Sequence, residues 1–439
     1  MRAFLACIVL SAAANAQTPL SLSLKRAVEI AVAPDGATRL ALAEEAIEQA
    51  EQRLAQTKAA FMPNLDTTIA ERRQTTNLRA FGFNFDLPVP GFSLPSLVGP
   101  FTVFDARTTA QQSVVNFADI KRFRASKANL AAVRSDAVTS KNQVTEEVSR
   151  NYLAGLRAEA ARATARANVE LSEALLKLAQ QEKNAGTGTG IDVTRAGVQL
   201  SNDRLRLIRA QNDEDRAVLI LLKSMGVALD APVELSTKLD DHPTEPPSVA
   251  DLLAKAKSGR PELKTQQQRE ESLRLTQLAV KDERLPTLGA AADYGAIGPD
   301  VAGSRGTYTL GVQMKVPMFD GFRRQARRQE AFSVLRQEQV RTRELNQQIE
   351  LQVRLALELL RSGSAEVEAA MNGITIAETE LAQARRRYQA GVSTSLEITD
   401  AQTRLQRARD NRLIALYDYN LARLDLAAAT GSIMEYVNQ

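Results

Sequence analysis

The ten-residue stretch Thr307–Val316, with the sequence TYTLGVQMKV, decides the fold. Its apolar and polar residues alternate without a break, which is typical of a β-strand with one apolar and one polar face. About ten residues is also the length that a tilted strand needs to cross the hydrocarbon core of a bilayer. We therefore predict a strand over 307–316 that is long enough to cross a membrane. Its apolar residues are Tyr308, Leu310, Val312, Met314 and Val316.

The chain is internally duplicated, and the strand belongs to the second copy. The motif AFMPNL at 60–65 recurs as ERLPTL at 283–288, and NFAD at 116–119 recurs as MFDG at 318–321. Two further pairs, Gly186 with Gly391 and Gly226 with Gly431, are separated by the same number of residues. Each half is therefore predicted to contain a helix, two strands and two further helices joined by a tight turn.

This duplication predicts the domain organisation of the whole chain. The predicted parts are a signal peptide at 1–16, a first repeat at 17–230, a Pro-rich linker at 231–247, a second repeat at 248–431 and a C-terminal tail at 432–439. The predicted strands are 65–78 and 104–115 in the first repeat, and 288–297 and 307–316 in the second. The loop between the first two strands is rich in Phe, which suits the aromatic girdle of a membrane barrel.

The N-terminus predicts export. Arg2 precedes an apolar core from Phe4 to Leu10, and the small residues Ala14-Asn15-Ala16 form a cleavage site. The alternative is a buried N-terminal helix. Cys7 is the only cysteine and lies inside this segment, so the mature chain is expected to have no disulfide and no Cys-based metal site.

The number of strands limits how the chain can meet a membrane. No segment after the signal has 18 uninterrupted apolar residues, so no membrane-spanning helix is expected. Four strands cannot close a barrel, since the smallest known membrane barrels have about eight. An open sheet in lipid would leave edge groups that each cost several kcal/mol. The strands must therefore stay out of lipid, as in a soluble β-sandwich, or be pooled by several copies, and three copies supply twelve.

The remaining sequence predicts very long helices. One continuous helical pattern covers 119–183 and another covers 321–389, with Gly155, Gly363 and Gly373 as weak points. The last helix has a seam that steps by three and four residues, which is typical of close helix packing and equally of a plain coiled coil. The seam residues are Ile398, Ala401, Leu405, Ala408, Arg412, Ala415, Tyr419, Ala422, Leu426 and Ala429.

With its repeated halves, paired strands and glycine-containing helical tips, the chain resembles the TolC family of outer-membrane efflux channels over about Leu20 to Gly431. The matching motifs are LSL (Leu22-Ser23-Leu24), FMPNL at 61–65, PMFDG at 317–321 and YQAGVS at 388–393. The resemblance implies a mainly α fold with a membrane β-barrel portion, in which a homotrimer shares a twelve-stranded barrel and long antiparallel helices form a tunnel. It also implies location in the outer membrane of a Gram-negative bacterium, extending into the periplasm. The implied partners are a periplasmic adaptor, an inner-membrane pump of the RND, ABC or MFS type and outer-membrane lipid.

The resemblance also implies the candidate site. Glu397 and Asp400, with Asp192 at the matching place in the first half, would form an acidic ring at the periplasmic aperture. The alternative is that these acids only favour helix N-termini. The resemblance places adaptor contacts at the tips, which can also be read as plain tight turns: Gly186, Thr187, Gly188, Gly391, Val392 and Ser393. Ser393 stands where the family's best-known member has an Arg that helps to close the tunnel, and Arg195 is a possible substitute.

Composition argues against other classes of function. The net charge is +4 with interspersed charges, so no nucleic-acid partner is expected. There is one His and no Trp, and neither catalytic residues, a cofactor site nor a metal site can be assembled; a metal role for His242 is disfavoured. The run Arg385-Arg386-Arg387 is interpreted as a solvated helix face. We therefore predict a passive channel of a tripartite efflux or secretion system, gated at its periplasmic tip and not an enzyme, with an exported coiled-coil structural protein of the periplasm as the alternative.

Overall fold

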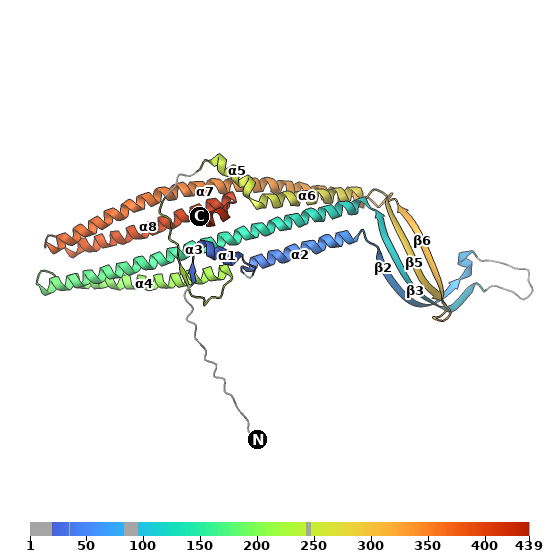
Figure 1. Cartoon of the computed structure of the whole chain (residues 1–439), viewed down its shortest axis with the longest axis horizontal. Coiled ribbons are helices and arrows are strands. Elements are labelled where there is room, and N and C mark those ends of the chain that lie inside the picture. The colour runs from blue at the N-terminus through green and yellow to red at the C-terminus, as the bar shows by residue number, and fades with distance from the viewer. Residues whose placement is uncertain (1–19, 35, 83–94, 243–246, 439) are drawn as a thin grey trace, which may run out of the picture. The chain divides into compact units, whose positions relative to one another are not determined.

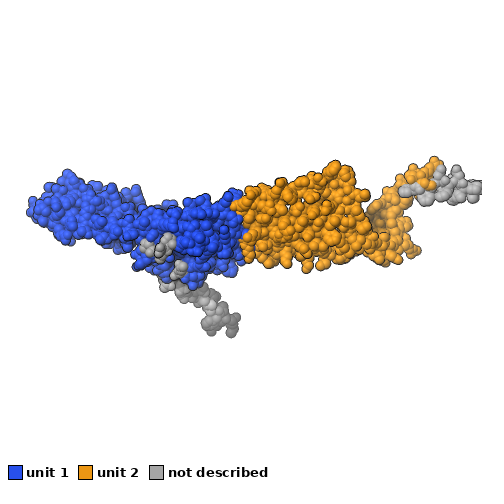
Figure 2. Space-filling model, turned by 90° about the horizontal axis from the view of Figure 1, so that it is seen from above, with its two compact units in different colours: residues 1–45, 135–263, 344–439 blue, residues 46–134, 264–343 orange. Residues whose placement is uncertain are grey.

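The computed structural model describes residues 20–34, 36–82, 95–242 and 247–438. The predicted signal peptide and most of the Phe-rich loop lie outside these residues. The chain forms two compact units, coloured separately in Figure 2. The first contains residues 1–45, 135–263 and 344–439, and the second contains residues 46–134 and 264–343. Each unit thus combines residues from both predicted repeats.

The second unit contains an antiparallel four-stranded sheet, in the order β2-β3-β5-β6 (Figure 1). The strands are β2 (Asn64–Asn77), β3 (Leu97–Val115), β5 (Thr287–Gly298) and β6 (Arg305–Lys315). The prediction of four strands is confirmed. The predicted start of β3 at residue 104 is wrong by seven residues, because the strand continues to pair with β2 beyond a register shift between Gln74 and Thr76. This irregularity interrupts the regular pairing only between Phe101 and Val98, so it accounts for the missed start of β3 but not for residues 101–103.

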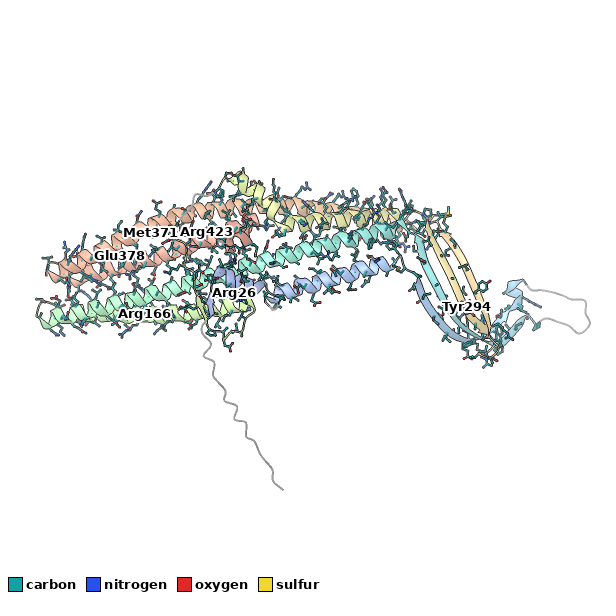
Figure 3. The ribbon with its side chains drawn as sticks, viewed as in Figure 1. Arg26, Arg166, Tyr294, Met371, Glu378 and Arg423 are labelled. Atoms are coloured by element: carbon teal, nitrogen blue, oxygen red, sulfur yellow. The ribbon has the colours of Figure 1, made fainter. Side chains whose placement is uncertain are left out.

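The two faces of this sheet differ as the alternation predicts. One row across all four strands contains Leu65, Ala110, Ala292 and Leu310. On this apolar face Tyr308 and Leu310 are each 80% exposed, and Figure 3 labels Tyr294 on the same sheet.

The opposite, polar face contains an ion pair between Arg107 of β3 and Asp293 of β5. Arg107 also donates a hydrogen bond of 2.9 Å from Nη2 to Thr307 Oγ1 of β6. The strands of a membrane barrel alternate an apolar face toward lipid with a polar face toward the interior, and this sheet has one face of each kind.

The helices are long, as predicted. They include α2 (Thr38–Ala59), α3 (Phe117–Asn184), α4 (Gly190–Met225), α6 (Pro261–Asp282), α7 (Arg323–Gln389) and α8 (Ser395–Thr430). Figure 1 shows α3 with α4, and α7 with α8, as antiparallel hairpins. Among the described residues no helix combines the length and the apolar character that a membrane-spanning helix needs.

The glycines inside α3 and α7 do not break these helices, and two of the three predicted weak points allow close packing. A Cβ on Gly155 would lie 2.9 Å from Leu235 Cδ1, and one on Gly363 would lie 3.2 Å from the Cα of Tyr419. Tyr419 itself is fully buried, with most of the predicted seam of α8. Gly155 and Gly363 are therefore close-contact points in the fold, whereas a Cβ on Gly373 would meet no described atom within 4 Å.

The core of the first unit includes elements that the sequence did not reveal. Strand β1 (Leu20–Leu22) pairs in parallel with β4 (Val233–Leu235), which lies inside the predicted linker. The hydroxyl of Tyr152 donates a hydrogen bond of 2.8 Å to the carbonyl of Leu22. Helices α1 (Leu24–Val32), α5 (Val249–Gly259) and α9 (Ile433–Val437) complete the set, and α9 lies in the predicted tail. Its residue Ile433 is buried in the same cluster as Leu22 and Tyr152.

Candidate functional site

The predicted tips are the turns between α3 and α4 and between α7 and α8, both within the first unit. Gly186 has φ 78° and Gly391 has φ 72°, a left-handed conformation that glycine adopts without the cost of a Cβ. The next amide in each turn closes the helix end: Thr187 N donates to Glu182 O at 3.0 Å, and Val392 N donates to Arg387 O at 3.0 Å. Both tips are therefore rigid helix ends followed by short connections.

Asp192 has two roles at these tips. It is the third residue of α4 and forms a capping box with Thr189, whose amide and hydroxyl donate to Asp192 Oδ2 at 3.0 and 2.6 Å. Its second oxygen, Oδ1, accepts a hydrogen bond from the hydroxyl of Ser395, the first residue of α8. Asp192 thus caps its own helix and also joins the two hairpins.

These contacts hold Asp192 in its charged form. Burial raises the pKa of Asp192, but the hydrogen bonds from Ser395 and Thr189 and the charge of Arg195 outweigh it, so the pKa is lower than usual. Tyr388 lines the same small cavity of about 30 Å³, together with Asp192 and Ser395. Burial raises the pKa of Tyr388, and the charges of Asp192 and Glu182 add to this effect. An ionised Asp192 beside a neutral Tyr388 is therefore the resting arrangement.

The other two predicted acids lie in the first two turns of α8 and differ in their partners. Glu397 Oε1 lies 3.1 Å from Arg387 Nε in the last turn of α7, so this pair joins the two helices of one hairpin. Asp400 is exposed and makes no ion pair or side-chain hydrogen bond among the described residues. The three predicted acids thus lie at the tips, where Asp192 and Glu397 are bound and Asp400 is open to solvent.

The remaining predicted tip residues are exposed except for Gly188 and Ser393, which are partly buried. Val392 is 66% exposed, and the neighbouring Ile191 and Leu396 are also exposed. The hydroxyl of Ser393 is buried and has no hydrogen-bond partner within the described part of the chain. Ser393 therefore does not replace the Arg of the resembling family as a bonded group.

The interpretation of Arg385-Arg386-Arg387 as a solvated face is correct for two residues. Arg386 and Arg387 are exposed, whereas Arg385 is partly buried and its Nε has no partner among the described residues. Burial also lowers the pKa of Arg385. The three residues differ in exposure because their side chains point to different sides of α7.

Sequence reasoning missed a buried polar network behind the tips. Asp203 of α4 is 1% exposed and accepts hydrogen bonds from Ser172 Oγ at 2.5 Å and Gln199 Nε2 at 3.1 Å. Two residues of α8 complete the network: Gln402 Nε2 donates to Ser172 Oγ at 2.5 Å, and Gln406 Nε2 donates to Asp203 Oδ1 at 3.3 Å. The sequence contains one sign of this network. The acid Asp203 lies three residues after Leu200, on the same buried face of α4.

A second cluster of ligand-type residues lies between β4 and α5. Asp240, Asp241 and His242 bring their ligand atoms within 4.8 Å of one another. Asp240 already forms an ion pair with Arg423 of α8, and the side chain of His242 is 88% exposed. Figure 3 labels Arg423 near the C-terminal end of α8. These contacts assign Asp240 a structural role.

Comparison with known proteins identifies relatives over most of the chain. A family model described as outer membrane efflux protein matches residues 33–227 and 252–432. The alkaline protease secretion protein AprF of Pseudomonas aeruginosa is 24% identical over 342 residues, covering 74% of this chain and 69% of AprF. The pyoverdine export outer membrane protein OpmQ of the same organism is 24% identical over 386 residues, covering 83% of this chain and 75% of OpmQ.

Solved structures share the fold. The outer membrane channel CmeC of Campylobacter jejuni superposes with a TM-score of 0.78 at 16% identity, covering 93% of this chain and 86% of CmeC. The outer membrane protein VceC of Vibrio cholerae also has a TM-score of 0.78 at 16% identity, covering 93% of this chain and 96% of VceC. The mainly helical architecture with four antiparallel strands is therefore a known fold.

Proposed function

We infer the function from the premise that this chain belongs to the outer membrane efflux protein family, which makes it an outer-membrane efflux or secretion channel of the TolC type. Members of this family are channels rather than enzymes, and they reside in the outer membrane of Gram-negative bacteria. Membership implies a trimeric channel that works with efflux or secretion machinery. The predictions of family, fold and channel function are thereby confirmed.

We propose that three copies pool their sheets into one twelve-stranded barrel. The observation that carries this proposal is the sheet itself, which ends in β2 and β6 and exposes an apolar face that includes Tyr308 and Leu310. Unpaired strand edges are costly in lipid, and they vanish only when a barrel closes. The polar face, with Arg107 and Asp293, then lines a wet interior.

We propose that the helical tips form the gate of this channel. The bond from Ser395 to Asp192 joins the α3–α4 and α7–α8 hairpins, and the pair of Arg387 with Glu397 holds the α7–α8 hairpin together. Repeated three times around an axis, Asp400 and Glu397 make acidic rings that favour cations. Opening then requires the hydrogen bond from Ser395 to be broken, while the backbone of each turn stays intact.

We propose that the tip surface receives a periplasmic adaptor and, through it, an inner-membrane pump of the RND, ABC or MFS type. The exposed apolar residues Ile191, Val392 and Leu396 surround turns made compact by Gly186 and Gly391, so partner helices can approach closely. One relative is named for protease secretion and another for pyoverdine export. We propose accordingly that the duct is passive and that its cargo is chosen by the pump.

Extraction and conductance test the channel proposal. Washed membranes should release the protein only in detergent, as a trimer, and the trimer should conduct in a planar bilayer. The rival, an exported coiled-coil structural protein, comes off with carbonate and does not conduct. If the trimer conducts but variants at the gate contacts leave its current unchanged, the channel proposal stands and the gate proposal is rejected.

A further inference from the structure

The junction between the sheet and its helices carries an exposed apolar surface that neither the gate nor the apolar face of the sheet includes. Just beyond β6, Phe319 is 75% exposed and Phe322 is 72% exposed, and Met318 between them and the strand is exposed as well. The two rings pack edge to face, with centroids 5.5 Å apart and an angle of 87°. We call Met318, Phe319 and Phe322 the junction belt.

The backbone of the junction belt is strained at Phe322. Phe322 has φ 65°, directly after Gly321 with φ 67°. A positive φ is ordinary for glycine, but for a bulky residue it is an outlier that costs about 1–3 kcal/mol and persists only where the surroundings enforce it. A large aromatic side chain held exposed at such a position indicates a partner outside the chain.

Helix α7 begins with an unusual charge pattern directly after the belt. Its first turns contain Arg323, Arg324, Arg327 and Arg328, and its first turn has no acid. Cations at a helix N-terminus oppose the helix dipole, each by about 0.3–1 kcal/mol. Anions outside this first turn are therefore needed to offset the positive charge.

Two of these four arginines form ion pairs within the chain, and the charge of Arg323 also acts on Asp320. Arg324 Nε lies 2.9 Å from Asp320 Oδ2, and Arg327 Nη2 lies 2.6 Å from Glu283 Oε2. Arg323 and Arg328 are exposed, and their guanidinium groups make no ion pair or hydrogen bond within the described ranges.

The other helix ends at this edge of the sheet add to the positive charge. The edge is one place in the fold, since Arg122 of α3 also bonds Glu283, and Phe61 packs edge to face on Phe123 with centroids 6.0 Å apart. Figure 1 shows the strands meeting the helices here. The exposed cations at this edge without an ion pair among the described residues include Lys58, Arg124, Arg284, Lys315, Arg323 and Arg328.

We propose that the junction belt and this cationic edge bind the anionic headgroups of phospholipids at the membrane surface. The inference rests on the proposed function, which places the apolar face of the adjoining sheet in lipid. Aromatic side chains favour the boundary between headgroups and acyl chains, and clustered Lys and Arg bind anionic headgroups. In the proposed barrel β6 meets β2 of the next copy, which brings a further exposed cation, Lys58, to this edge.

Lipid binding to a charge-matched pair of variants tests the inference. Arg323→Gln with Arg328→Gln removes two exposed, unpaired cations of the junction. Arg343→Gln with Arg386→Gln removes two from the same helix beyond it. The purified trimer in neutral detergent is titrated with fluorescent phosphatidylglycerol, with phosphatidylcholine as the uncharged probe. We expect the junction variant to lose phosphatidylglycerol affinity about tenfold or more, an effect that added salt diminishes, while the matched variant keeps wild-type affinity.

Three results would overturn the inference. They are unchanged phosphatidylglycerol affinity in the junction variant, an equal loss in the matched variant, and dissociation of the junction variant into monomers, which would make this edge a contact between copies. Conductance of the wild type in phosphatidylcholine separates the two proposals. A conducting trimer without headgroup preference rejects only the lipid site, whereas a wild type that neither trimerises nor conducts rejects the channel as well.

Discussion

The hydroxyl of Ser395 donates a hydrogen bond to Asp192, and this contact joins the first turn of α8 to the first turn of α4. Asp192 also caps α4 through Thr189, so its position is fixed within its own hairpin as well. The contact therefore links a fixed acceptor on one hairpin to a donor on the other. It is the most direct target for testing the proposed gate.

Ser395→Ala should shift the gate toward its open state by about tenfold or more, because a hydrogen bond to a charged group contributes about 1.5–3 kcal/mol. Single-channel recordings measure this as open probability. Ser393→Ala is the matched control, since the buried hydroxyl of Ser393 has no partner in the described structure and its loss breaks no bond. Equal behaviour of the two variants would argue against a latch at Ser395.

The gate should be insensitive to pH over the neutral and mildly acidic range. The pKa of Asp192 is lower in the folded tip than its usual value of about 3.9, so the contact is fully present above that value. It is lost as the pH falls through the lowered pKa. Conductance is expected to stay flat from about pH 7 to 5 and to rise below about pH 4. Asp192→Asn, scanned in parallel, should abolish that rise; an identical rise in the variant would assign it to other groups.

Glu397→Gln with Asp400→Asn should reduce the cation preference of the channel, because it removes two carboxylates per copy from the proposed ring. Reversal potentials across a salt gradient measure this preference. Asp400→Asn alone breaks no ion pair among the described residues, so it should change selectivity with little effect on opening. Glu397→Gln alone also removes an exposed pair with Arg387, which contributes about 0–1 kcal/mol. Asp418→Asn, an exposed acid farther along α8, is the control, and selectivity unchanged in all of these variants would reject the ring.

Asp203→Ala should lower the free energy of unfolding by about 2–4 kcal/mol, because it leaves the buried donors of Ser172 and Gln406 and the partly buried donor of Gln199 without their acceptor. Thermal unfolding of the detergent-solubilised protein measures the change. Asp213→Ala on the same helix is the control: Asp213 is exposed and lies 3.9 Å from Arg216, so its removal should cost less than about 0.5 kcal/mol. Similar melting of the two variants would show that the buried network contributes no stability.

Much of the fold follows from repeating patterns in consecutive residues. The period of two predicted β6, and the longer helical period predicted α3, α7 and the buried seam of α8, because these patterns depend only on neighbouring positions. Three-residue strands such as β1 and β4 are too short to show a period. They pair across more than 200 residues of sequence, so their partner could not be predicted. The five-residue helix α9 escaped prediction for the same reason.

The candidate site, like the fold, could be predicted from the sequence only in part. Acids in the first turns of α4 and α8 are visible in the sequence, but their partners are not. Asp192 bonds Ser395, Glu397 pairs with Arg387, and Asp400 remains open to solvent. Which of these acids is bound and which is free depends on how the hairpins meet.

The sequence by itself determined four strands of alternating character, two long helical hairpins and glycine turns at their tips, since each of these is a property of residues that follow one another. Only the tertiary structure decided that Asp203 is buried and satisfied, and that Phe322 is held exposed at a positive φ beside unpaired arginines. Burial and pairing depend on which surfaces come together. That choice is made by packing between segments far apart in the chain, where no local pattern records it.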